Sequence, residues 1–181
     1  MFVPGRIHHV DGLVADGEVV FVHPFRYLND CLSFRSDDRV ADLPLTRQDP
    51  LYDRLVFCGI AGRTGGGMIS AMVRHAFGID LDKEWLYAEC GLPSTADTSR
   101  YRPAGALCVP PRNGVLEQLP AAAERPGCVR EAMFTGAVGQ EFHSGVKSGL
   151  FPAGYVVDGD SEEDVATHLE HVAGWFSDNS R

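Results

Sequence analysis

The chain has 181 residues, enough for one ordinary domain or for two small subdomains that share a core. Hydrophobic residues make up 44% and charged residues 23%, and this balance excludes an intrinsically disordered protein. Sixteen basic and 25 acidic residues leave a net charge of -9, which argues against a nucleic acid as partner because such binding needs a basic surface.

Neither a membrane span nor a secretion signal is visible in the sequence. No apolar run reaches the length needed to cross a bilayer, and the first residues, MFVPGR, lack the apolar core of a signal peptide. The five cysteines are widely spaced and form no CxxC pair, which is typical of reduced thiols in a cytosolic protein. We therefore expect a cytoplasmic protein without a membrane partner.

The chain opens on two strand-like runs, residues 6–14 and 18–27. Between them lies Asp16-Gly17, a strong signal for a tight hairpin turn. Residues 29–50 are polar and contain three short clusters with aspartate, so they are predicted to form a long surface loop. The opening of this protein is therefore predicted to be a β-hairpin followed by irregular chain.

A short apolar strand is predicted at Val56–Ala61, followed by a glycine-rich turn. Apolar residues then recur at helical spacing over 68–77 and again over 81–90, and a glycine follows each run as a natural helix stop. Trp85 in the second helix is expected to anchor a core.

A polar linker is predicted at 94–102, and short strand-like runs follow it. They cover 104–109, 114–119, 128–134 and 153–157. Ser161 is a good N-cap for a final amphipathic helix, because three acidic residues follow it and suit a helix start. The whole pattern predicts an α+β fold with mainly antiparallel sheets.

The first candidate for chemistry is the pair His9 and Asp11 on the opening strand. Alternation places both side chains on one face, where they could contact a nucleotide or a metal. The ordinary interpretation is a polar pair on a solvated sheet face, and it is favoured about two to one.

The second candidate is the turn Arg63-Thr64-Gly65-Gly66-Gly67, between a strand and a helix. Glycines allow backbone N–H groups to approach an anion, and an arginine binds a carboxylate or phosphate with two parallel hydrogen bonds. The turn lacks the lysine and spacing of a phosphate-binding P-loop, so a plain tight turn is the favoured interpretation.

Taken together, these segments resemble the ATP-grasp superfamily, and in particular the C-terminal part of bacterial L-amino acid ligases. The opening "GRIHHVDGLVADGEVVFV" is similar to the hairpin that lines the family's nucleotide cleft. The stretch "FCGIAGRTGGGMISAMVRHAFGIDLDKEWL" is similar to the final catalytic strand and the helix after it. From Ala104 onward, "AGALCVPPRNGVLEQLP" and the segments after it resemble the small C-terminal β-rich subdomain.

This resemblance implies an ATP- and Mg²⁺-dependent ligase that activates a carboxylate, such as that of an amino acid, as an acyl phosphate for attack by an amine. It implies that Arg63 holds the substrate carboxylate or the transferred phosphate, in a catalytic role. It also implies that His9, Asp11 and Gly66 border the nucleotide.

Two departures from the family pattern put catalysis in doubt. The family has a glutamate four residues before the arginine, and this chain has Gly59 there. The strand that bears the other acidic residue is missing, because DPLYDRL runs directly into VFC. The phosphate-covering lysines belong to a part that would precede Met1. We therefore assign no metal ligand and expect doubtful ATP binding.

Domain division and function follow as hypotheses. Residues 1–93 are predicted to be a partial ATP-grasp lobe, and residues 103–181 a small α+β subdomain. The chain is a ligase part that is inactive alone, a binding or assembly module that works with a separate N-terminal half, or an unrelated interaction domain. Because a lost strand leaves its neighbours without hydrogen-bond partners, we also expect a marginally stable or self-associating protein.

Overall fold

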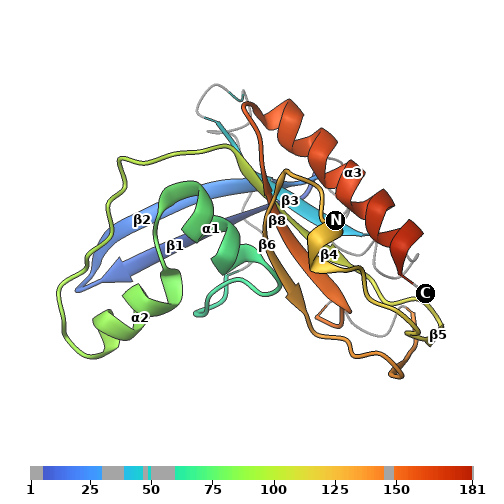
Figure 1. Cartoon of the computed structure of the whole chain (residues 1–181). Coiled ribbons are helices and arrows are strands. Elements are labelled where there is room, and N and C mark those ends of the chain that lie inside the picture. The colour runs from blue at the N-terminus through green and yellow to red at the C-terminus, as the bar shows by residue number, and fades with distance from the viewer. Residues whose placement is uncertain (1–5, 30–38, 47–48, 50–59, 145–148, 181) are drawn as a thin grey trace, which may run out of the picture.

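A computed structural model describes residues 6–29, 39–46, 49, 60–144 and 149–180. Six strands form one antiparallel sheet in the order β1-β2-β3-β4-β8-β6, and two short strands form a second sheet (Figure 1). The strands are β1 (His8–Ala15), β2 (Glu18–Tyr27), β3 (Val40–Pro44), β4 (Ala104–Val109), β5 (Gly114–Val115), β6 (Val129–Phe134), β7 (Glu141–Phe142) and β8 (Ala153–Asp158). The helices are α1 (Ile69–Phe77), α2 (Leu81–Glu89) and α3 (Glu162–Asn179), with a short 3₁₀ turn at Ala122–Glu124. This architecture confirms the predicted α+β fold with antiparallel pairing.

The β1–β2 hairpin forms where the sequence predicts it. Asp16 and Gly17 both have positive φ, 51° and 80°, as a two-residue turn that matches the twist of the strands requires. The register pairs His9 with Phe25 and Leu13 with Phe21, so these side chains share one face of the sheet.

The prediction of a loop over 29–50 is wrong for residues 40–44. These residues form β3, which pairs with β2 on one side and with β4 on the other. Asp42 gives the segment a polar appearance in the sequence, yet only 4% of this residue is exposed. The strand tolerates the buried carboxylate because a histidine on β1 contacts it.

Helices α1 and α2 cover one face of the sheet. Met72, Val73 and Phe77 of α1 are buried in a core that also contains Phe25 and Val156. The helix stops at Gly78, which has the positive φ that a left-handed cap requires. Helix α2 is confirmed as well, with Asp80 as its N-cap.

The expectation for Trp85 is wrong, because half of this residue is exposed. The α2 residues that are buried are Leu81 and Glu84, and the carboxylate of Glu84 accepts hydrogen bonds from Ser94 and Thr95. Helix α2 thus packs against the rest of the protein through Leu81 and the hydrogen-bonded Glu84, and the indole of Trp85 is half exposed.

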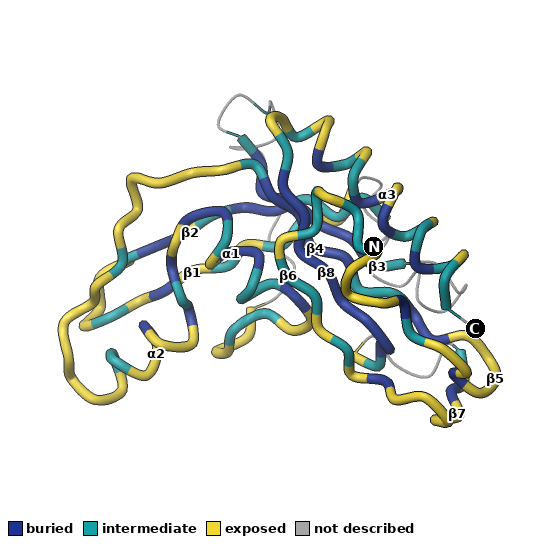
Figure 2. The backbone as a smooth tube through the Cα atoms, viewed as in Figure 1, coloured by how far each residue is buried: buried dark blue, intermediate teal, exposed yellow. Residues whose placement is uncertain are grey.

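Helix α3 covers the other face of the same sheet. It begins at the predicted N-cap, since the Ser161 hydroxyl accepts a hydrogen bond from the Asp164 N–H at 3.1 Å. Its buried side chains pack against Leu43, Leu107 and Tyr155. Every residue of β8 is buried, because helices cover both faces of the sheet, as the dark tube at the centre of Figure 2 shows.

The predicted boundary at 94–102 is irregular chain without helix or strand. The large sheet nevertheless crosses it, because β3 from the first predicted unit pairs with β4 from the second. The division into two subdomains stays a prediction. Most of the predicted strand Val56–Ala61, including Gly59, lies outside the described residues.

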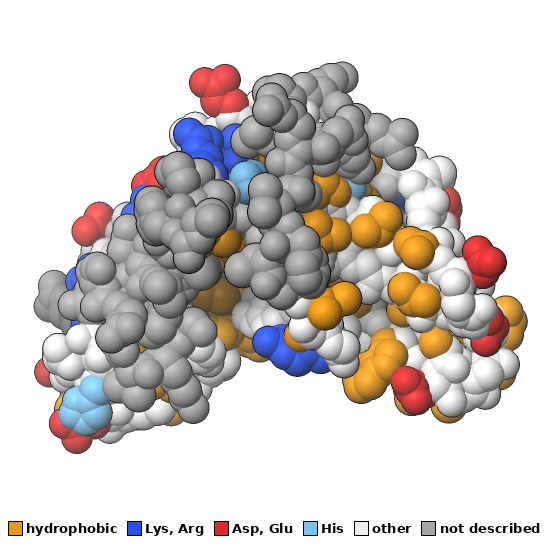
Figure 3. All heavy atoms as spheres, turned by 180° about the vertical axis from the view of Figure 1, so that it is seen from behind, with side chains coloured by type: hydrophobic (Ala, Val, Ile, Leu, Met, Phe, Trp, Pro, Cys, Tyr) orange, Lys and Arg blue, Asp and Glu red, His pale blue; other side chains and the backbone are white. Residues whose placement is uncertain are grey.

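The outer face of the β1–β2 hairpin is apolar and exposed. Val10, Val14, Val19 and Val22 each expose more than half of their surface. Hydrophobic side chains gather on the half of the protein that carries this hairpin when it is viewed from behind (Figure 3). Among the described residues, no helix has both the length and the apolar character that a membrane crossing needs.

Candidate functional site

His9 lies between two aspartates on the face of the sheet that α1 covers. Its Nδ1 is 2.5 Å from Asp11 Oδ2, two residues along β1, and its Nε2 is 2.7 Å from Asp42 Oδ2 on β3. The three side chains are 17%, 12% and 6% exposed, respectively. The sequence therefore predicts two members of this cluster, and the third comes from the strand that it does not predict.

The hydrogen bonds determine the charge of His9. An ionised carboxylate accepts hydrogen bonds and donates none, so both ring nitrogens must carry a proton. Burial lowers the pKa of His9, but the hydrogen bonds to Asp11 and Asp42 outweigh it and raise the pKa to about 9. Burial raises the pKa of Asp42, and its hydrogen bond to His9 opposes that rise, so the imidazolium and the two aspartates form one coupled hydrogen-bonded cluster.

Aromatic rings fix the orientation of the imidazolium. The ring of Phe25, which faces His9 in the hairpin, stacks on it with centroids 4.9 Å apart and planes 7° from parallel. The ring of Tyr27 lies 5.0 Å away on the same strand. A cation above an aromatic face is attracted by the ring quadrupole, so Phe25 favours the protonated histidine as well as holding it in place.

The glycine-rich turn lies against this cluster. A side chain at Gly65 would bring its Cβ to 3.0 Å from Asp11 Oδ1 and to 2.7 Å from the Ile69 side chain. At Gly67, which has a φ of +65°, a Cβ would lie 2.8 Å from the sulfur of Cys108. The glycines thus permit a close approach of the turn to the sheet. Burial raises the pKa of the Cys108 thiol to about 12, so this thiol stays protonated.

The other two predicted site residues, Arg63 and Gly66, lie on the same turn. Arg63 is exposed, and its Nη1 donates to the backbone oxygen of Thr64 at 3.0 Å. Its guanidinium makes no ion pair with the described residues. A Cβ at Gly66 would meet nothing within 4 Å, so neighbouring atoms leave room beside it. His9 and Asp11 are in contact, whereas no hydrogen bond or ion pair within the described part of the chain joins Arg63 or Gly66 to either of them.

An open groove of about 510 Å³ borders the hairpin side of the site. Its lining includes the rings of Phe21, His23, Phe77 and Tyr101. His23 lies opposite Asp11 in the hairpin, and its ring is 23° from parallel to that of Tyr101 at a centroid distance of 6.3 Å. A groove with stacked rings suits a flat apolar group.

The described residues do not fit a magnesium site. Within them, no group of three histidine, cysteine, aspartate or glutamate side chains is arranged to hold a metal ion. Asp11 and Asp42 each commit one oxygen to His9, and the positive ring between them opposes a second cation. Gly59, the position where the resemblance implies a glutamate, lies outside the described residues.

No protein-family model and no curated protein matches the sequence. In structure, the chain is similar to phosphoribosylglycinamide synthetase from Anaerococcus prevotii, with a TM-score of 0.67 and 14% identity over 99% of this chain and 53% of that one. It is also similar to L-amino acid ligase from Bacillus licheniformis, with a TM-score of 0.62 and 15% identity over 99% of this chain and 52% of that one.

Both of these enzymes have the ATP-grasp fold, and the chain spans about half the length of each. The chain therefore has the fold of the C-terminal half of an ATP-grasp enzyme. At these identities the likeness is one of fold alone.

Proposed function

We propose that this chain is the C-terminal part of an ATP-grasp carboxylate–amine ligase and that it does not catalyse the reaction by itself. The observation that carries the proposal is the coverage. Nearly all of this chain matches two ligases, whereas only about half of each ligase is matched. A reaction that needs the whole ligase fold is therefore beyond the matched half alone.

The chemistry of the described cluster supports the same proposal. Acyl-phosphate formation from a magnesium-bound triphosphate needs carboxylates that are free to bind the metal. Here Asp11 and Asp42 instead surround a protonated His9, which they hold in position. Such a cluster rigidifies the sheet and offers a surface beside the glycine turn, but it does not replace an acidic metal site.

In this proposal the chain works with an N-terminal ATP-grasp half that supplies the phosphate-covering lysines and the carboxylates that hold the metal. The half-length match to the two ligases supports this partner. The candidate surface for contact with substrate is the turn that carries Arg63 and Gly66, because the guanidinium of Arg63 is exposed and contacts only its own turn among the described residues.

Calorimetric titration of the isolated chain with Mg-ATP tests the proposal directly. We expect no binding in the micromolar to low millimolar range, and no hydroxamate when ATP, a set of amino acids and hydroxylamine are supplied to trap an acyl phosphate. Addition of an N-terminal half that carries both the lysines and metal-binding carboxylates is expected to restore ATP turnover, and Arg63→Met should then reduce it strongly. Trapped hydroxamate from the isolated chain would refute the inactive-alone part.

Restoring a single acid is not expected to restore the reaction. In Gly59→Glu the chain regains the carboxylate that the resemblance implies, but it regains neither the second acid that the resemblance implies nor the part of the ligase fold that it does not match. We expect hydroxamate formation to stay at the level of the buffer blank. Ligase activity of this variant without a partner would contradict the proposal.

A further inference from the structure

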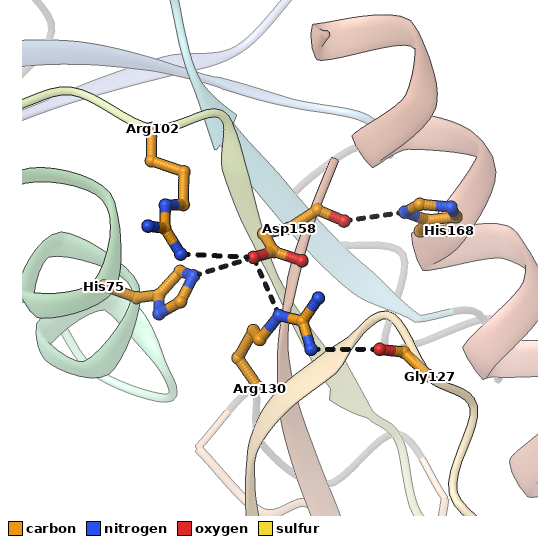
Figure 4. A network of polar contacts seen from close by, with 6 residues as sticks. All are labelled: His75, Arg102, Gly127, Arg130, Asp158 and His168. Carbon is orange, nitrogen blue, oxygen red and sulfur yellow. Dashed lines mark hydrogen bonds and ion pairs between the residues drawn. The ribbon is translucent and has the colours of Figure 1, made fainter. Parts of the chain in front are cut away.

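Asp158, the last residue of β8, contacts basic side chains from three other segments (Figure 4). Its Oδ2 accepts a hydrogen bond from Arg130 Nε at 2.7 Å and lies 3.2 Å from His75 Nε2 and 3.7 Å from Arg102 Nη1. Its backbone oxygen accepts from His168 Nδ1 at 2.7 Å. The residue therefore joins α1, the segment before β4, strand β6 and helix α3.

Positive charge at this cluster exceeds what one carboxylate neutralises. Arg102 and Arg130 are always protonated, so the two guanidiniums and Asp158 leave one positive unit even with a neutral His75. Arg130 also donates from Nη1 to the Gly127 oxygen, and its Nη2 has no hydrogen-bond partner among the described residues. The side chains of Arg102 and Arg130 are 57% and 44% exposed. Donor groups of both arginines therefore stay available for an anion.

A β-bulge supplies one of these arginines. Val129 on β6 pairs with Val157 and Glu131 pairs with Val156, so Arg130 is the extra residue between two consecutive pairs. A bulge redirects a side chain at a small cost in sheet pairing, and such irregularities are frequent beside functional sites.

Both arginines line an open cavity of about 730 Å³ at the protein surface. Its lining also includes Asp160, Asp164 and His168, from the segment after β8 and the first turns of α3. The two carboxylates form no ion pair within the described part of the chain. Because His168 Nδ1 donates to a carbonyl, Nε2 of the neutral ring is an acceptor. One part of the lining thus presents hydrogen-bond donors, and another presents acceptors.

We propose that this cavity binds a small molecule that carries both an anionic group, phosphate or carboxylate, and a protonated amine. The anionic group binds the guanidinium edges of Arg102 and Arg130. The amine binds Asp160 and Asp164, with His168 as a further acceptor. The carboxylates of Asp160 and Asp164 would repel a ligand that carries only an anionic group. The guanidiniums of Arg102 and Arg130 would repel a ligand that carries only a cationic group, so a ligand with both groups matches the lining best.

This cavity is separate from the cluster around His9. The glycine turn precedes α1, whereas His75 lies near its end, and the helical stretch from Ile69 to His75 corresponds to about 9 Å. The inference does not depend on the proposed ligase function, because it uses only the charges and contacts of the described cavity.

Binding of four probes tests the inference on the intact chain by calorimetry at neutral pH. Phosphoethanolamine and γ-aminobutyrate carry both groups, with phosphate and carboxylate respectively, while inorganic phosphate and ethylammonium carry one group each. We expect at least one of the two-group probes to bind about tenfold or more tightly than either single-group probe. The preferred two-group probe identifies the anionic group.

Two variants assign the binding to the two parts of the lining. Arg102→Gln should weaken the preferred probe about tenfold or more, and Asp164→Asn should remove its advantage over the single-group anion. Arg112→Gln and Asp82→Asn, which lie outside the cavity, serve as matched controls and should bind like the wild type. Circular dichroism checks that each variant is folded. If Arg102→Gln does not fold, Asp164→Asn alone tests the inference. The inference is overturned if no probe binds below 10 mM, or if the cavity variants bind like the controls.

Discussion

His9 shows how a single protonated side chain links the structure to pH. Its pKa is about 9 in the folded protein and 6.5 as a free side chain, so between these values the folded state holds a proton that the unfolded state has released. The stabilisation is fully present below pH 6.5 and is lost as the pH rises through 9. A shift of this size corresponds to about 3 kcal/mol.

We therefore expect the free energy of unfolding to fall between pH 6.5 and 9, by up to about 1.4 kcal/mol per pH unit. In His9→Gln this decline should be much flatter. Urea denaturation at a series of pH values measures both slopes, and His8→Gln, at the neighbouring position of the same strand, is the control that should keep the wild-type slope. Equal slopes for wild type and His9→Gln would show that the imidazolium is not held as described.

The glycine turn gives a second prediction for single residues. Gly67→Ala places a side chain at a φ of +65° and 2.8 Å from the Cys108 sulfur, so we expect it to lower the free energy of unfolding by about 2 kcal/mol. Gly66→Ala meets no atom within 4 Å and should change stability by less than about 0.5 kcal/mol. Chemical denaturation compares the two adjacent positions, and a neutral Gly67→Ala would mean that the turn does not approach the sheet this closely.

Alternation along β1 is enough to place His9 and Asp11 on one face, because that rule needs only the local sequence. Asp42 could not be predicted as their partner. An isolated aspartate in a polar segment is typical of a loop, and only the pairing of β3 with β2 brings it near His9. Arg63 and Gly66 were selected from the glycine-rich turn, and the roles that the resemblance implies for them stay predictions.

Among the elements, those with strong local signals were predicted well. The Asp16-Gly17 turn, the stop at Gly78 and the N-cap Ser161 depend on backbone geometry that a few neighbouring residues determine. Strand β3 was missed because it is five residues long and contains Asp42, so its burial depends on distant partners. Trp85 was placed wrongly because helical spacing does not reveal which side of a short helix meets the sheet.

Helix α3 is expected to contribute to stability through its buried apolar side. Leu169 of α3 is fully buried against the sheet, so Leu169→Ala should lower the free energy of unfolding by about 3 kcal/mol. Leu86→Ala on α2 removes the same atoms from a residue that is 59% exposed, and it should cost less than about 0.5 kcal/mol. Denaturant titration of both variants makes the comparison, and equal losses would contradict the packing of α3.

For the whole molecule, the apolar outer face of the β1–β2 hairpin favours self-association. In the described sheet β1 is an edge strand, so its backbone groups and the exposed valines are available to a second copy. We expect sedimentation velocity to show concentration-dependent association that the double variant Val10→Lys and Val22→Lys suppresses. Val138→Lys, at an exposed valine elsewhere, is the control. A wild type that stays monomeric at all concentrations and unfolds cooperatively would contradict this expectation.

The pairing of β3 with β4 also determines when the protein can fold during its synthesis. The core under α1 contains Ala104, Ala106 and Val156 as well as Phe25 and Phe77, so residues synthesised early lack their packing partners until β8 has left the ribosome. A nascent chain that ends within the linker therefore exposes an unfinished apolar face. The centre of the sheet cannot close before β8 has emerged, and until then the growing polypeptide is a natural substrate for chaperones.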